Sequence, residues 1–116
     1  WMMINVYGLN NCDTCRKARK WLDAEGVDHR FHDIRKADLD HAVIAGWADR
    51  AGWETLLNRR GTTWRGLPES AKENIDESGA TKLMTEHPAL IKRPVFVLEN
   101  DVMVGFSAEV QAALTR

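Results

Sequence analysis

The sequence contains little cysteine and little proline, and it has no long apolar run. Two cysteines and three prolines among 116 residues are too few for the disulfide framework of a small secreted protein. No stretch approaches the roughly 18 apolar residues of a membrane-spanning helix, and the start lacks the regions of a signal peptide. Trp1 is not an initiator residue, so Trp1 and Met2 are expected to stand outside the fold. These absences favour a cytoplasmic protein without a membrane segment.

Charge of one sign is not in excess either. The chain has 16 Lys and Arg against 17 Asp and Glu, a net charge of −1. Direct binding to nucleic acid or to a membrane surface is therefore not expected, because both need a strong positive excess. A chain of this length buries about two thirds of its unfolded surface, so one domain over residues 1–116 is expected. The protein is also expected to be a monomer.

The first third of the chain predicts a strand, a helix and a second strand. Met3–Tyr7 (MINVY) has the composition of a strand. Helical spacing of apolar residues begins at Asp13 and stops at Gly26. Val27–Ile34 alternates as a strand does. Such a βαβ unit places its two strands parallel, joined by a right-handed crossover.

The middle of the chain, at about residues 38–90, carries mainly helical signals. Apolar residues recur at helical spacing there, and helices are expected over Leu39–Ala51, from Trp53 and over Ala80–His87, with a turn or helix from Pro68. A β-hairpin of Val95–Leu98 with Val102–Val104 and a helix capped by Ser107 follow. The order β-α-β, helical insertion, β-β-α predicts an α/β fold of the thioredoxin-like type with a mixed four-stranded sheet.

The two cysteines stand three residues apart where the first strand leads into the first helix. A thiol attacks as its thiolate, and at a pKa near 8.5 only a few per cent of a thiol is ionised at neutral pH. Cys12 is expected at the helix N-terminus, where backbone N–H groups favour an anion, and Arg16 and Lys17 add positive charge. Cys15, one turn along, lies close enough to close a disulfide. The pair predicts a nucleophile and a resolving thiol, and the alternative is two small buried apolar residues.

A metal site is a further alternative for the same cysteines. With His29 and His32 they read as C-x2-C-x13-H-x2-H, close to a zinc-finger spacing. A finger, however, holds its histidines three to five residues apart on a helix. His29 and His32 fall in an expected strand, where residues three apart point to opposite faces. No metal is therefore expected, and both histidines are expected to be exposed.

Two later segments carry arginine. In IKRPVF, Ile91–Phe96, a proline enters a strand, which requires that the strand begins there or that the proline peptide is cis. In LLNRRGTTWRG, Leu56–Gly66, arginines stand among glycines. Guanidinium groups bind oxyanions and carboxylates in a planar fork. The second segment therefore predicts either an anion site or an exposed basic turn. The alternative for Arg93 is an ordinary exposed arginine before a trans-proline.

These blocks resemble the arsenate reductase (ArsC) family, and within it the YffB-like proteins related to the Spx regulators. The resemblance runs from YGLNNCDTCRKARKWL through WETLLNRRGTTWRGL and LMTEHPALIKRPVFVL to VGFS, and so covers nearly the whole chain. It implies a thioredoxin-like fold with a helical insertion after the second strand. It also implies a cis-proline at Pro94, with Arg93 directed towards Cys12.

The resemblance assigns roles to individual positions. It makes Cys12 the nucleophile, and it matches Arg93 and Arg60, or less closely Arg59, to two of the three arginines that hold the oxyanion in arsenate reductases. The third arginine has no counterpart, because Gly105 and Phe106 stand at its position. Loss of one such contact predicts anion binding weaker by about 1.5 to 3 kcal/mol.

The expected function is that of a thiol-dependent oxidoreductase. In it, Cys12 forms a mixed disulfide that Cys15 or an external thiol resolves, and glutathione is a co-substrate in place of a tightly bound cofactor. The expected substrate-binding residues are Asn11, Arg16, Arg60, Arg93 and Pro94. One alternative is an arsenate reductase linked to glutathione and glutaredoxin. The other is a redox-sensing regulator similar to Spx, which docks on the RNA polymerase α subunit.

Overall fold

The computed structural model describes residues 3–115, so the expectation about Trp1 and Met2 falls outside the described residues. The chain divides into two compact units. The first unit combines the chain up to Asp38 with the chain from Arg93 onward, and the second spans Leu39–Lys92. The second unit thus takes up most of the segment at about 38–90 in which the sequence predicts a helical insertion.

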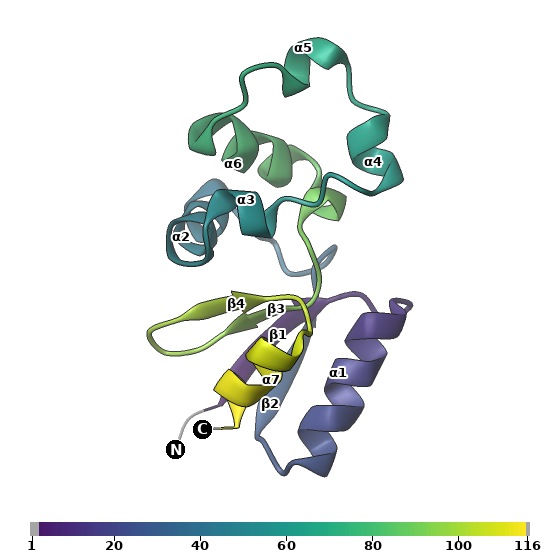
Figure 1. Cartoon of the computed structure of the whole chain (residues 1–116), viewed down its shortest axis with the longest axis vertical. Helices are drawn as coiled ribbons and strands as arrows, with labels where there is room; N and C mark the ends of the chain where they lie inside the picture. Colours follow the sequence, from purple (N-terminus) through teal and green to yellow (C-terminus); the bar gives the residue numbers. More distant parts are fainter. Residues whose placement is uncertain (1–2, 116) are drawn as a thin grey trace. The chain divides into compact units, whose positions relative to one another are not determined.

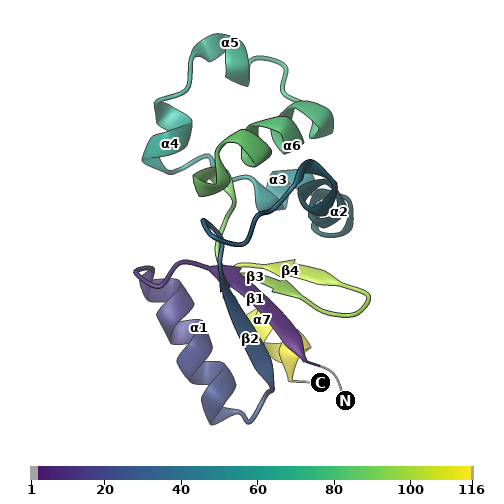
Figure 2. The same cartoon turned by 180° about the vertical axis from the view of Figure 1, so that it is seen from behind.

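The first unit is built on a four-stranded mixed sheet with the strand order β2-β1-β3-β4 (Figures 1 and 2). Its strands are β1 (Ile4–Gly8), β2 (His29–Asp33), β3 (Val95–Val97) and β4 (Val102–Val104). β1 runs parallel to β2 and antiparallel to β3, and β4 pairs antiparallel to β3. β1 is therefore a central strand, and its carboxyl end leads directly into the loop that carries Cys12.

Helices α1 (Asp13–Ala24) and α7 (Ala108–Leu114) lie against the same face of this sheet (Figure 1). Alternate residues of β1 point to that face, because successive side chains of a strand alternate between its two sides. The buried cluster between helices and sheet consists of Ile4, Val6, Ala18, Leu22, Phe96 and Leu114. Full burial of a large apolar side chain contributes roughly 1.5 to 3 kcal/mol, so this core holds α1 against β1.

The fold class and the mixed four-stranded sheet predicted from the sequence are confirmed. Strand ends differ by one or two residues, since β1 runs to Gly8 and β2 covers only His29–Asp33. The predicted stop of the first helix at Gly26 is confirmed by its left-handed backbone (φ 69°), which glycine adopts without a steric cost. The predicted cap is also confirmed, because the Ser107 hydroxyl accepts a hydrogen bond from the Val110 N–H at 3.3 Å.

The second unit is made of short helices. They are α2 (His41–Ala51), α3 (Trp53–Leu56), α4 (Thr62–Arg65), α5 (Glu69–Lys72), α6 (Glu77–Glu86) and the 3-10 helix η1 (Pro88–Leu90). The two longest helices begin at aspartates whose carboxylates accept hydrogen bonds from backbone N–H groups, Asp40 from Val43 and Asp76 from Gly79. α2 packs against both α3 and α6, with buried apolar residues that include Ile44, Trp47, Leu56 and Met84.

Two elements of the second unit do not follow from the sequence. α4 lies in the arginine-rich segment between glycines, where the sequence indicates no helix, and η1 begins at Pro88, where the helical pattern ends. Both are only three or four residues long, so they leave no periodic pattern of apolar residues. Across residues 3–115, the structure has no helix that is both long and apolar enough to span a bilayer.

Candidate active site

Cys12 occupies the N-cap position of α1. Its backbone is extended (φ −97°, ψ 122°), and its carbonyl accepts the first helical hydrogen bond, from the Arg16 N–H at 3.0 Å. Its own N–H donates to the Leu9 carbonyl at 3.3 Å, which closes the turn between β1 and α1. The Cys12 residue is half-buried, so its thiol is anchored by the turn and still reaches solvent.

The surroundings of Cys12 favour its thiolate. Partial burial acts to raise the pKa of this thiol, but hydrogen bonds from the Cys15 N–H, the Cys15 side chain, the Arg93 side chain and the Thr14 N–H together hold the pKa below its ordinary value. The N–H groups of Thr14 and Cys15 belong to the first turn of α1, whose N–H donors have no partner within the helix. The expected anion at the helix N-terminus therefore has two sources of stabilisation, the first turn of α1 and one arginine from another part of the chain.

Cys15 has the opposite environment. Its side chain is fully buried, and burial together with the neighbouring Cys12 raises the pKa of Cys15 to about 11, although the Leu9 N–H and Arg93 favour its ionisation. The two thiols are both free cysteines. At neutral pH the pair therefore consists of one thiol poised to ionise and one that keeps its proton.

Gly8 is the residue that makes room for Cys15. A Cβ atom added at Gly8 would lie 2.5 Å from the Cys15 Sγ and 3.4 Å from the Phe31 ring. A separation of 2.5 Å is well inside van der Waals contact, so any side chain at this last position of β1 displaces the sulfur. The strand pattern of MINVY ends at Tyr7 and gives no indication of this role for Gly8.

Arg93 and Pro94 enter the site from the segment before β3. The Arg93–Pro94 peptide bond is cis, as the resemblance implies. Arg93 is half-buried, and its side chain hydrogen-bonds to Cys12. Pro94 is buried, and its carbonyl accepts a hydrogen bond from the Gly105 N–H at 2.8 Å. The structure thus brings Arg93 and Pro94 together with both cysteines.

Gly105 explains in part why the third arginine is missing. Its backbone is in the left-handed region (φ 85°), which favours glycine over every residue with a side chain. The Gly105 N–H bond to Pro94 fixes that conformation next to the site. An arginine at this position would therefore strain the turn that supports Pro94.

Asn11 and Arg16 lie on the surface beside Cys12. Both are exposed. The Arg16 guanidinium, which the sequence predicts to add positive charge near Cys12, forms an ion pair with Asp13 and also donates to the Asn10 carbonyl at 3.4 Å. Arg19 donates to the Asn10 side chain at 3.2 Å and lies over the Phe31 ring, 4.1 Å from its centroid. These arginines therefore hold the loop that precedes the cysteine.

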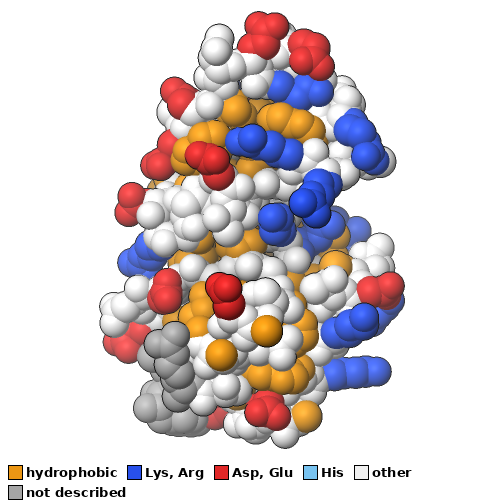
Figure 3. Space-filling view, in the orientation of Figure 1, with side chains coloured by type: hydrophobic (Ala, Val, Ile, Leu, Met, Phe, Trp, Pro, Cys, Tyr) orange, Lys and Arg blue, Asp and Glu red, His pale blue; other side chains and the backbone are white. Residues whose placement is uncertain are grey.

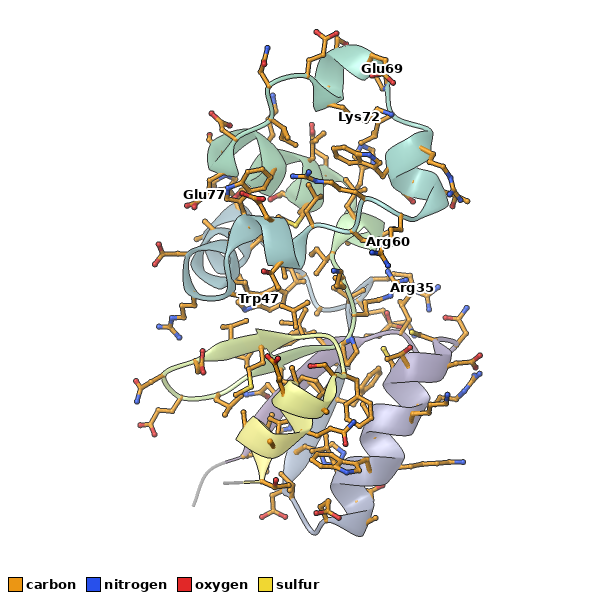
Figure 4. The ribbon with its side chains drawn as sticks, in the orientation of Figure 1. Arg35, Trp47, Arg60, Glu69, Lys72 and Glu77 are labelled. Atoms are coloured by element: carbon orange, nitrogen blue, oxygen red, sulfur yellow. The ribbon has the colours of Figure 1, made fainter. Side chains whose placement is uncertain are left out.

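Arg60 belongs to the second unit and is exposed there (Figure 4). It lines a pocket of about 200 Å³ together with Glu54, Leu57, Asn58, Arg59 and Lys92. The Asn58 carboxamide oxygen accepts a hydrogen bond from the Arg60 N–H at 3.0 Å, which shapes the turn. Three cationic side chains against one carboxylate make this pocket suited to an anionic group.

The histidines of the proposed zinc pattern do not join the cysteines. His32 accepts or donates a hydrogen bond with the Asn5 side chain at 2.9 Å and stacks on Tyr7, with ring centroids 4.6 Å apart. The His29 ring bonds to the Val27 carbonyl at 2.9 Å. Within residues 3–115 no three His, Cys, Asp or Glu side chains are grouped so as to hold a metal. The expectation that both histidines are exposed is wrong, because each is half-buried through these contacts.

The sheet order, the cysteine pair at the start of α1 and the cis-proline before β3 define a protein of the thioredoxin-like class. Within that class, the chain belongs to the ArsC family, whose model matches residues 7–114. The resemblance found in the sequence is thereby confirmed.

Individual relatives agree with this assignment. The solved structure of a YFFB protein is 42% identical, covers 97% of this chain and 99% of its own, and superposes with a TM-score of 0.91. An arsenate reductase (ArsC) related protein from Brucella melitensis is 43% identical and superposes with a TM-score of 0.79. The match covers 97% of this chain and 93% of the Brucella chain. The global transcriptional regulator Spx of Streptococcus pyogenes is 27% identical over 98% of this chain and 87% of its own.

Proposed function

We propose that this protein is a thiol–disulfide oxidoreductase that uses glutathione, with Cys12 as its nucleophile. The observation that carries the proposal is the environment of the Cys12 thiol, which is accessible at the N-cap of α1 and hydrogen-bonded by Arg93, so that its pKa is lowered. An accessible thiolate of this kind attacks disulfides, whereas a buried neutral thiol does not.

The first step is attack by the Cys12 thiolate on a mixed disulfide between a substrate and glutathione. A bond forms between Cys12 Sγ and the glutathione sulfur, the substrate–glutathione S–S bond breaks, and the substrate leaves as a thiolate that takes up a proton. The substrate is reduced, and Cys12 carries glutathione. The reaction needs no tightly bound cofactor, and it suits the reducing cytoplasm.

The second step frees glutathione by one of two routes. In one, Cys15 loses its proton and attacks Cys12 Sγ, and glutathione leaves as a thiolate while the Cys12–Cys15 disulfide forms. The Cys12 thiolate raises the pKa of Cys15, so capture of Cys12 in a mixed disulfide removes that charge and makes Cys15 easier to ionise. In the other route, the thiolate of a second glutathione attacks the bound glutathione sulfur, which yields oxidised glutathione and the Cys12 thiolate.

Positively charged groups are expected to hold the partner. Glutathione carries two carboxylates, and Arg93 at the thiol is suited to bind such a group. Arg60 is proposed as a further substrate-binding residue on the strength of the family resemblance. Asn11 and Arg16, both exposed next to Cys12, are placed to contact the same ligand. Pro94 supports Arg93 and the partner backbone from the segment before β3.

Arsenate reduction is a second candidate with the same nucleophile, and glutaredoxin would then complete the reaction. The relationship to an arsenate reductase related protein favours it. The left-handed glycine at position 105 counts against efficient turnover, because it excludes an arginine that would help to hold the oxyanion.

A redox-sensing regulator is a third candidate, supported by the relationship to Spx over most of both chains. In this role the Cys12–Cys15 disulfide would act as a switch, and the partner would be the RNA polymerase α subunit. Copurification with that subunit, lost after oxidation of the cysteines, distinguishes this candidate from the enzyme.

The proposed function is tested with the variants Cys12→Ser and Cys15→Ser. Reduction of a glutathione-mixed disulfide is followed spectroscopically, and the protein adducts are identified by intact mass. We expect Cys12→Ser to lose all activity above the background rate, and Cys15→Ser to accumulate a glutathione adduct on Cys12. Wild-type rates in Cys12→Ser would refute the mechanism. Full turnover in Cys15→Ser without an accumulated adduct would assign the second step to external glutathione.

A further inference from the structure

The positive charge of the first unit is concentrated on α1. Four of five consecutive residues are basic, namely Arg16, Lys17, Arg19 and Lys20, and together they are called the basic face below. The chain as a whole has a net charge of −1, so this run reflects local segregation of charge. Figure 3 shows blue side chains projecting from the edge of the first unit at which α1 lies.

The four side chains are held in different ways. Arg16 and Arg19 are tied to the loop before Cys12 and to Asp13 and Phe31. Lys17 and Lys20 are exposed, and no ion pair with another described residue involves either of them. Arg16, Arg19 and Lys20 also line a shallow hollow of about 240 Å³ with Asp23. The basic face thus combines two guanidinium groups held by neighbouring residues with two exposed ammonium groups.

The basic face begins one turn from the reactive thiol. At a rise of 1.5 Å per residue, its members lie about 6 to 12 Å from Cys12 along the helix axis. A specific protein interface covers on the order of 800 Å² on each partner, so a protein whose sulfur reaches Cys12 also covers this part of α1. A small thiol such as glutathione covers far less.

We propose that the basic face of α1 is the docking surface for a protein thiol partner whose own reactive cysteine is surrounded by acidic residues. This proposal rests on the proposed function, and the partner is the protein that reduces the Cys12–Cys15 disulfide back to two thiols. Complementary charge speeds the encounter of two proteins and excludes partners of like charge.

The exchange on this surface regenerates both cysteines. The partner's thiolate attacks Cys12 Sγ of the Cys12–Cys15 disulfide, because Cys15 is fully buried, and Cys15 leaves as a thiolate that takes up a proton. A second thiol of the partner, after losing its proton, then attacks the partner sulfur of the mixed disulfide. Cys12 leaves as a thiolate, the partner becomes a disulfide, and two electrons pass from the partner to this protein.

The experiment measures exchange between reduced Cys15→Ser protein and two peptides, each with one cysteine activated as a 2-thiopyridyl disulfide. The peptides are identical except that glutamates or lysines flank the cysteine. Release of thiopyridone gives the second-order rate constant, and the ratio of the two constants removes the intrinsic reactivity of Cys12. We expect the acidic peptide to react about tenfold faster at low salt, and the ratio to approach one at about 1 M salt.

Two charge-reversed pairs locate the effect. In the double variant Lys17→Glu/Lys20→Glu on the basic face, the ratio of the rate constants for the acidic and basic peptides is expected to fall to one or below. Arg50→Glu with Lys82→Glu, exposed positions on α2 and α6, makes the same change in net charge and is expected to leave the ratio high. Equal ratios in the two variants, or a wild-type ratio of one, would overturn the docking surface. No reaction with neutral 2,2′-dithiodipyridine would instead show that the proposed function itself has failed.

Discussion

In the first unit the candidate functional side chains lie next to strands of the sheet. In the second unit they lie in turns between helices of only a few residues. Cys12 is anchored between β1 and α1, and Arg93 lies two residues before the start of β3, so each is next to an element of the sheet unit that contributes to its buried core. Arg59 and Arg60 lie in the turn between α3 and α4, each of which is four residues long. The first unit therefore holds the Cys12 thiol and the Arg93 side chain in defined positions, while the second unit presents a group of positively charged side chains.

The side chains around Trp64 show how the second unit holds such a turn. The Arg59 guanidinium lies 5.3 Å from the centroid of the Trp53 ring and 5.8 Å from that of Trp64, and the Lys72 ammonium lies 5.7 Å from Trp64 on α4. Lys72 also pairs with Glu69 at 3.4 Å (Figure 4). Contacts of this kind have soft geometry, so they suit binding of a charged ligand better than positioning of a nucleophile.

The largest effect in either unit is expected from truncation of a fully buried leucine. Leu22→Ala in the first unit and Leu56→Ala in the second each remove a fully buried side chain. Each is expected to lower the free energy of unfolding by about 2 to 5 kcal/mol, measured by urea denaturation. The difference between the units should appear in hydrogen exchange, where Leu56→Ala loses protection first in α2, α3 and α6, and Leu22→Ala first in α1 and β1.

No leucine among residues 3–115 is exposed, so no exposed leucine can serve as a control for these truncations. Val43→Ala serves instead. Val43 lies on α2 and is exposed, and its truncation is expected to change the free energy of unfolding by about 0.5 kcal/mol or less. If Leu56→Ala and Leu22→Ala expose the same set of amides to exchange, the two units unfold as one and the comparison between them fails.

A smaller effect, on reactivity, is expected from Arg93→Met. The lowered pKa of Cys12 means that its thiolate persists as the pH falls, until the pH passes through that pKa. Loss of the hydrogen bond from Arg93 moves this decline to higher pH. A hydrogen bond to a charged group contributes about 1.5 to 3 kcal/mol, so alkylation of Cys12 by iodoacetamide in mildly acidic buffer should slow about tenfold or more.

The matched control is Arg50→Met, which removes an exposed arginine from the second unit. Its pH profile of alkylation should match that of the unaltered protein. An unchanged profile in Arg93→Met would mean that the first turn of α1 alone stabilises the thiolate.

The first unit could be predicted from the sequence because its signals are local. MINVY and VFVL have the pattern of strands, Gly26 and Ser107 mark helix ends, and the spacing of Cys12 and Cys15 on one helix places them together. What the sequence could not predict is the contact of Gly8 with the Cys15 sulfur, since it depends on how closely α1 packs on β1. A glycine next to a cysteine motif, where no turn requires it, is the signal that could have indicated it.

The role of Arg16 also escaped prediction, for a different reason. Its spacing of four residues from Cys12 is correct for a contact along the helix, but Asp13, three residues before Arg16, competes for the guanidinium. Helical spacing shows which residues a side chain can contact, but it does not show which of them the side chain contacts in the structure. In the second unit, α4 and η1 are too short for periodicity to reveal them.

The smallest effect is expected from Trp64→Leu, which tests whether the contacts around Trp64 hold the turn. Each cation–π contact at such a site contributes about 0.5 to 1 kcal/mol, so the free energy of unfolding should fall by about 1 to 2 kcal/mol. Trp64→Phe keeps an aromatic face and should lose less. Proteolysis of the native protein gives a second measurement, because a loosened turn between α3 and α5 is cut earlier. If Trp64→Leu and Trp64→Phe resist protease as well as the unaltered protein does, packing of the helices alone positions Arg59 and Arg60, and the second unit is as rigid at its charged pocket as the first is at Cys12.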